Sequence, residues 1–85
     1  MKYRVEINIM PIEGLLDPAG KAVTEALHNI HLSEISSVRI GKRIILELEA
    51  EDKENARRIA ETACRKLLVN PVMESSDIKI VSASF

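Results

Sequence analysis

The 85-residue sequence predicts an α+β fold, a single-domain βαββαβ ferredoxin-like sandwich in which two helices cover one face of a mostly antiparallel sheet. Two observations predict it. The apolar residues change period along the chain in the order strand, helix, strand region, helix, strand, and no linker, repeat or low-complexity tract interrupts that order. Because single cores commonly occupy roughly 100–200 residues, residues 1–85 are expected to form one domain.

A change of period at Asp17 separates the first strand from the first helix. Before it, apolar residues alternate with polar ones, as in a half-buried strand: Tyr3, Val5, Ile7 and Ile9. After it, the apolar residues fall on one side of a helix that ends about Asn29: Ala19, Ala22, Val23, Ala26, Leu27 and Ile30. Asp17 is a suitable N-cap and Pro18 suits the first helical position, so the helix begins there.

Residues 36–50 return to alternation, and two geometries fit them. A three-residue loop, Gly41 to Arg43, makes a hairpin that pairs Ile40 with Ile44 and Val38 with Leu46. One long strand bent at Gly41 fits as well, because these apolar residues share parity. The hairpin is the preferred prediction and the bent strand its alternative.

A second helix is predicted over residues 52–69, followed by a short last strand that contains Ile78 and Ile80. The inward residues of this second helix are expected to be Ala56, Ile59, Ala60, Ala63 and Leu67. Asn70-Pro71 ends the helix, because the residue before a proline is pushed out of helical backbone geometry. The single cysteine, Cys64, is expected to be a reduced core thiol.

The composition excludes several classes of protein. Twelve basic against thirteen acidic side chains, with one Tyr, one Phe and no Trp, do not provide the basic face and stacking aromatics of a nucleic-acid-binding protein. The alternating N-terminus resembles neither a signal peptide nor a membrane span, so a cytoplasmic location is expected. A chain this short buries only about 60–65% of its unfolded surface, and a homo-oligomer is therefore expected.

The stretch GLLDPAGKA, residues 14–22, has the G-x-x-x-x-G-K spacing of a phosphate-binding loop. Such a loop points backbone N–H groups at an anion and follows its lysine with a hydroxyl that holds magnesium. Here Pro18 has no N–H, Asp17 places a carboxylate where phosphates would sit, and Ala22 has no hydroxyl. We therefore predict no nucleotide site on this chain.

The other candidate chemistries are weak. His28 and His31 lie three residues apart near a helix end, where a partial positive charge is favourable, without a third ligand that would make a metal site. The acidic run from Glu47 to Glu54 is typical of a solvated face and a helix start. No catalytic, cofactor-binding or metal-binding residue is predicted.

Gly20 and Lys21 fit their helix poorly. Glycine inside a helix costs about 1 kcal/mol relative to alanine, and a cation near the helix N-terminus faces the positive end of its dipole. Residues that break local rules without a local gain suggest close approach of another backbone, either a packed strand or a partner subunit.

Three stretches together resemble the PurS family, the small subunit of the bacterial and archaeal phosphoribosylformylglycinamidine (FGAM) synthase complex. They are L-D-P-A-G-K-A-V at residues 16–23, V-R-I-G-K at residues 38–42, and L-L-V-N-P-V at residues 67–72. The likeness covers almost the whole chain, and this combination is far more specific than the phosphate-loop spacing alone.

The resemblance implies a structural and assembly subunit of de novo purine biosynthesis that is not itself catalytic. In that family a PurQ-type glutaminase subunit releases ammonia, and a PurL-type synthetase subunit uses ATP and magnesium to convert formylglycinamide ribonucleotide to formylglycinamidine ribonucleotide. The PurS subunit joins the two and is itself a homo-oligomer, a dimer or tetramer. This chain would then belong to a glutamine amidotransferase and ligase complex, with no cofactor of its own.

The same resemblance, with the residues that the fold leaves unexplained, predicts a partner-binding set: Asp17, Gly20, Lys21, Arg39, Gly41, Lys42, Asn70 and Pro71. The alternative function is an ACT-like regulatory module, which shares the βαββαβ order and binds small molecules near the loop after the first strand, where Gly14 would allow close approach. That alternative would also dimerise.

Overall fold

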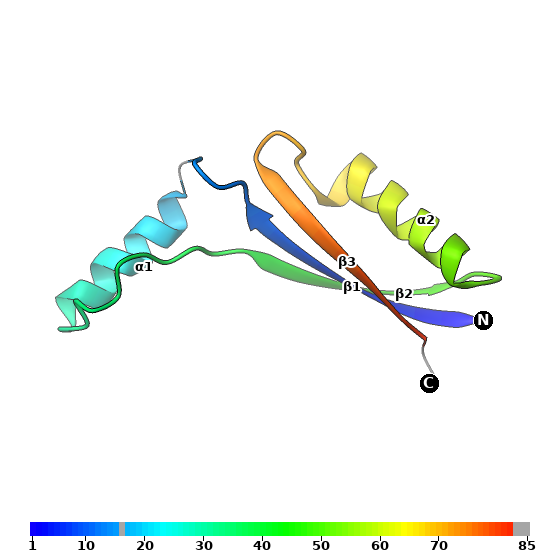
Figure 1. Cartoon of the computed structure of the whole chain (residues 1–85), viewed down its shortest axis with the longest axis horizontal. Coiled ribbons are helices and arrows are strands. Elements are labelled where there is room, and N and C mark those ends of the chain that lie inside the picture. Colours follow the sequence, from blue (N-terminus) through cyan, green and yellow to red (C-terminus); the bar gives the residue numbers. More distant parts are fainter. Residues whose placement is uncertain (16, 83–85) are drawn as a thin grey trace.

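The computed structural model describes residues 1–15 and 17–82 (Figure 1). In chain order the elements are β1 (Lys2–Pro11), α1 (Pro18–Asn29), β2 (Lys42–Glu49), α2 (Lys53–Ala63), the π-helical turn η1 (Cys64–Leu68) and β3 (Glu74–Ser82). The predicted α+β class, with two helices and an antiparallel sheet, is confirmed. Leu16, the first residue of the L-D-P stretch, lies outside the described residues.

In the described part of the chain the sheet has three strands in the order β2-β1-β3, and β1 pairs antiparallel with both neighbours. The register places Val5 opposite Leu46 on one side and Ile80 on the other. Ile7 lies between Ile44 and Ile78 in the same way. Because side chains alternate across a strand, these apolar residues share one face of the sheet.

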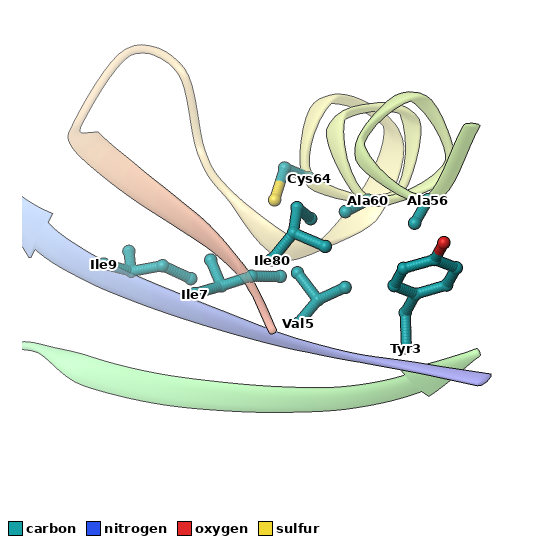
Figure 2. Close-up of a cluster of buried hydrophobic side chains, with 8 residues drawn as sticks. All are labelled: Tyr3, Val5, Ile7, Ile9, Ala56, Ala60, Cys64 and Ile80. Carbon is teal, nitrogen blue, oxygen red and sulfur yellow. The ribbon is translucent and has the colours of Figure 1, made fainter. Parts of the chain in front are cut away.

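That face carries the core, which α2 covers (Figure 2). The buried residues are Tyr3, Val5, Ile7, Ile9, Ala56, Ala60, Cys64 and Ile80. The predicted strand residues of β1 are thus confirmed as core, as is the buried thiol of Cys64. The small residues of α2 recur every four positions, which lets the helix backbone approach the sheet closely.

Two inward residues were predicted wrongly in this second helix. Leu67 is 83% exposed and Ile59 is 37% exposed. The reason for Leu67 is the π-helical turn, in which the Val69 N–H donates to the Cys64 carbonyl oxygen at 3.0 Å. That wider turn shifts the helical phase, so Leu68 instead packs against the core.

The predicted hairpin at Gly41 to Arg43 is wrong, and its alternative is closer to the structure. Ile44 pairs with Ile7 of β1, and no pairing of Ile40 with Ile44 occurs among the described residues. The chain passes through Gly41 without turning back, and only its second part, β2, is a strand. Gly41 lies against the end of β1, where a Cβ would collide with the Ile9 carbonyl oxygen and the Met10 sulfur.

Helix α1 does not share the sheet face with α2, contrary to the two-helix layer expected. Within residues 1–15 and 17–82, it contacts no strand and extends beyond the sheet beside residues 36–41 (Figure 1). We call residues 17–41 the arm. Because of the arm the molecule measures 51 × 29 × 14 Å, and its radius of gyration of 16.6 Å exceeds the roughly 12 Å typical of a compact chain of this length.

Candidate partner-binding surface

Asp17 holds the two sides of the arm together. Its Oδ1 accepts from the Gly20 N–H at 3.0 Å, which confirms it as the N-cap of α1, and its Oδ2 accepts from the Ile40 N–H at 3.1 Å. The hydrogen bond from Gly20, then that from Ile40, and the charge of Arg39 hold the pKa of Asp17 below its ordinary value of 3.8. The carboxylate therefore fastens the start of α1 to residues 36–40, the segment that returns along the helix. We call these two hydrogen bonds of Asp17 the clamp.

The hydrogen bonds of Asp17 explain the residues that match the phosphate-loop spacing without a bound phosphate. The Gly20 N–H, one of the donors that such a loop would present, already donates to Asp17. The Lys21 N–H donates to the Asp17 carbonyl oxygen at 3.0 Å as part of the helix. The glycine and lysine of G-x-x-x-x-G-K thus stand in a capped first turn.

The structure supplies a local reason for both glycines of the predicted partner-binding set. A Cβ at Gly20 would collide with the Val38 carbonyl oxygen of the arm, and Gly41 is confined by the end of β1. The close backbone approach inferred for Gly20 thus comes from the chain's own returning segment. Neither glycine requires a partner subunit to explain it.

A second group of contacts fastens the arm and the start of β2 to the end of the sheet. The Arg39 guanidinium donates to the Pro11 carbonyl oxygen at the end of β1. Lys42 Nζ lies 3.6 Å from Glu74 Oε2 at the start of β3, and Glu74 Oε1 accepts from the Asn70 N–H at 2.9 Å. The Lys42 side chain of the second resemblance stretch and the Asn70 backbone N–H of the third therefore meet through the Glu74 carboxylate.

We call this arrangement the sheet-end cluster, made of Pro11, Asp17, Arg39, Lys42, Asn70 and Glu74. A surface hollow of about 300 Å³ brings its parts together, because Asp17 and Asn70 both line it. Sequence reasoning missed Glu74, although an acid four residues after Asn70 was a usable signal. It also missed the carbonyl of Pro11, for which the sequence carries no signal.

Besides the two glycines, two further residues of the predicted set, Lys21 and Pro71, lie outside the cluster. Lys21 borders a separate hollow of about 430 Å³ along the arm, together with Glu25 and His28. Pro71 borders a third hollow, between α2, η1 and β3. Both residues are exposed, so they remain accessible in the single chain.

The other titratable side chains considered for chemistry, His28 and Cys64, make contacts within the fold. His28 Nε2 lies 2.6 Å from the Ile35 carbonyl oxygen, a contact inside the arm. Burial, followed by the charge of Glu61, raises the pKa of the Cys64 thiol above its ordinary value of 9.0. In residues 1–15 and 17–82 no three His, Cys, Asp or Glu side chains are placed to hold a metal ion, and no helix could span a membrane.

The fold and this surface define a small α+β protein that combines an open three-stranded sheet with a projecting arm. The family model of PurS, phosphoribosylformylglycinamidine (FGAM) synthase, matches residues 4–82. The chain belongs to the PurS family.

Curated relatives and solved structures agree with that assignment. The PurS subunit of Thermotoga maritima is 35% identical over 77 residues, covering 91% of this chain and 94% of that protein. The PurS subunit of Bacillus subtilis is 40% identical over 72 residues, covering 85% and 84%. A crystal form of Bacillus subtilis PurS superimposes with a TM-score of 0.86 at 35% identity, covering 94% of this chain and 99% of that one. A chain of the PurLQS structure from Thermotoga maritima gives a TM-score of 0.86 at 33% identity, covering 95% and 99%.

Proposed function

We propose that this chain is the PurS subunit of an FGAM synthase of purine biosynthesis and assembles with PurL-type and PurQ-type subunits. The observation that carries the proposal is the likeness over almost the whole chain to a component of the PurLQS structure of Thermotoga maritima. The match covers 95% of this chain and 99% of that one. Residues 1–85 act as one PurS-like unit in this proposal.

The chain holds the other two subunits in place and catalyses no step of the reaction itself. The synthetase subunit uses ATP and magnesium, the glutaminase subunit supplies ammonia, and the bridging chain holds the two in register. The whole complex is an ATP-dependent ligase of the cytoplasm, whereas the isolated chain is catalytically silent. Family membership favours this function over the ACT-like regulatory module.

The partner surface is centred on the sheet-end cluster and the adjoining edge of α1. Asp17, Gly20, Gly41 and Asn70 act indirectly, because their contacts hold neighbouring backbone in place. The side chains that reach solvent act directly: Lys21, Arg39, Lys42 and Pro71. Exposed cations of this kind select partners and speed association through complementary charge.

Reconstitution with the two larger subunits tests this function. Lys42→Glu should leave the fold intact, because the ion pair with Glu74 that it breaks is partly exposed and such pairs contribute only about 0–1 kcal/mol. It should reduce glutamine-dependent synthesis more than ammonium-dependent synthesis, because free ammonia bypasses the glutaminase. Lys53→Glu, an exposed substitution at the start of α2 where an acid suits the helix dipole, is the matched control.

The two rates distinguish the outcomes. Equal losses with glutamine and with ammonium would mean that the chain supports the synthetase itself rather than the coupling. Unchanged rates with both would remove Lys42 from the partner surface. Separately, calorimetry of the isolated chain with magnesium and ATP should show no binding, and micromolar affinity would contradict a purely structural role.

A further inference from the structure

A hollow of about 520 Å³ lies between β3 and the helical segment formed by α2 and η1. Its described lining includes residues of β3 but none of β1, so the hollow lies on the outer side of β3. That side of β3 pairs with no strand among residues 1–15 and 17–82. The partner surface proposed above includes only Pro71 of the residues that line this hollow.

The outer edge of β3 is a regular template for another strand. The register of β3 with β1 continues without a bulge from Glu74 to Ser82, and its nine residues include no proline. Bulges and prolines are among the devices by which proteins protect exposed edges from pairing. Alternate backbone N–H and C=O groups of β3 therefore lack a strand partner within the described chain.

A stripe of charged side chains on the helical segment lies over this edge. Ala56, Ala60 and Cys64 form the buried stripe that faces the sheet (Figure 2). The residue that follows each of them lines the hollow: Arg57, Glu61 and Arg65. Because residues four apart lie on the same side of a helix, these three form a second stripe in the order cation, anion, cation. We call it the charged stripe.

Both cations of the charged stripe lack an ion pair in the described chain. The ion pairs found in residues 1–15 and 17–82 all join residues of the sheet strands. Arg57 and Arg65 are exposed and take part in none of them. The two guanidinium groups are therefore available to acidic side chains of another molecule.

The spacing of the charged stripe suits an added strand. Its successive members are about 6 Å apart along the helix axis, since an α-helix rises about 1.5 Å per residue. Every second residue of a strand lies on the same face, at intervals of about 6.6–6.8 Å. Helix α2 and β3 run along each other in opposite directions (Figure 1). Three alternate side chains of a strand added to β3 would thus lie opposite the three members of the stripe.

We propose that an extended segment of one of the two larger subunits adds a strand to the outer edge of β3 and directs two acidic side chains, four residues apart, at Arg57 and Arg65. The residue midway between those acids faces Glu61 and is a cation or a hydrogen-bond donor. Asp77 lines the hollow from the opposite face of the sheet, where a polar residue of the same segment meets it. The proposal takes its partner from the function proposed above and assigns it a second contact surface.

The charges of the groove argue against a second copy of this chain as the occupant. The face of β3 directed at α2 has one acid, Glu74, which already pairs with Lys42. It does not supply two acids four residues apart. A twofold axis that overlapped two charged stripes fully would set Arg57 against Arg65 and Glu61 against its own copy. Like charges that face each other disfavour that arrangement.

Reversal of the two cations tests the site in the assembled complex. Arg57→Glu with Arg65→Glu should weaken binding of the chain to the two larger subunits by about tenfold or more, because each new acid would face an acid of the bound segment. Arg58→Glu with Lys66→Glu is the matched control, with the same change of charge at exposed positions outside the hollow. The affinity of that control should stay within about threefold of the unmodified protein. Fluorescence anisotropy of the labelled chain measures both affinities.

Two further measurements keep the proposal open to failure if charge reversal disturbs α2. Arg57→Met with Arg65→Met keeps the long side-chain stems, so binding should weaken by a smaller factor, and the loss should shrink at high salt. Hydrogen exchange reports on the backbone pairing. The β3 amides that point away from β1 should exchange about tenfold more slowly in the complex than in the isolated chain, whereas those that point toward β1 should change little.

The outcomes separate this site from the proposed function. Equal affinities of the two charge-reversed double variants, or unchanged exchange of the β3 amides, would overturn the site. A reversal that changes the mass of the isolated chain in light scattering, with partner binding unaffected, would assign the groove to a second copy and would also overturn it. Failure of the unmodified chain to bind either larger subunit would reject the proposed function and this site with it, whereas the other outcomes leave that function intact.

Discussion

Two regions of the molecule use similar apolar residues with opposite results. One is the arm, and the other is the rest of the described chain, which we call the sheet half. In the sheet half, Val5, Ile7 and Ile9 are fully buried between two neighbouring strands and α2. In the arm, Gly20 is the one buried residue of α1 within the described chain. The sheet half therefore carries its own core, whereas the arm is held by hydrogen bonds and by close backbone contact. A helical apolar pattern indicates a surface to be buried, but it does not say which chain buries it.

The largest expected effect comes from the core of the sheet half. Ile7→Ala should lower the free energy of unfolding by about 2–5 kcal/mol, because it removes buried methyl groups and leaves a cavity. Val23→Ala, in the arm, should change the unfolding of dilute single chains by less than about 1 kcal/mol. Urea titrations of both variants provide the measurement. Similar losses for the two variants in a monomeric sample would remove the contrast between the halves.

Gly20→Ala tests the close backbone contact of the arm. Alanine gains about 1 kcal/mol of helix propensity, but the collision with the Val38 carbonyl should reverse that gain and destabilise the arm by about 1–3 kcal/mol. Hydrogen exchange of α1 amides reports on the arm alone. Ala22→Gly, an exposed position of the same helix, should cost about 1 kcal/mol through propensity only. A more protected α1 in Gly20→Ala would contradict the contact.

Asp17→Asn should loosen the clamp at neutral pH, because its amide can accept from Gly20 but would turn an NH₂ toward the Ile40 N–H. The pH dependence gives a second signature. Since the folded-state pKa of Asp17 lies below 3.8, its contribution is present above that pH and is lost as the pH falls through the folded-state value.

Arm protection measured by hydrogen exchange between about pH 5 and pH 2 should therefore decline more steeply in the unmodified protein than in Asp17→Asn. Identical profiles for the two proteins would mean that this carboxylate does not couple the arm to pH.

The smallest effect is expected at the junction of the two halves. Lys42→Met removes a partly exposed ion pair with Glu74 and should change the free energy of unfolding by less than about 1 kcal/mol. The change should shrink further at high salt, where exposed charges are screened. Chemical denaturation at low and high ionic strength provides the measurement. A loss of several kcal/mol, insensitive to salt, would show that Lys42 is a structural anchor.

The sequence by itself determined the local features of this protein. Period-two alternation located the buried side of β1, and Asp17 with Pro18 located the start of α1, because capping and alternation depend on neighbours in the chain. The N-P dipeptide correctly ended the second helical segment before Asn70. The combination of three stretches was enough to identify the family, which the match over residues 4–82 confirms.

Only the tertiary structure decided where the chain goes after Gly41 and what surrounds the two glycines. The apolar residues of segment 36–50 alternate in the same way in a hairpin with a three-residue loop and in a chain that continues through Gly41. Alternation therefore cannot distinguish the two geometries, and the path of the chain depends on how closely Gly41 approaches β1. The π-helical turn likewise changes which leucine packs inward without changing the apolar pattern. The meeting of Asp17 and Asn70 at one hollow depends on residues more than fifty positions apart, and such contacts form through long-range packing that local sequence does not encode.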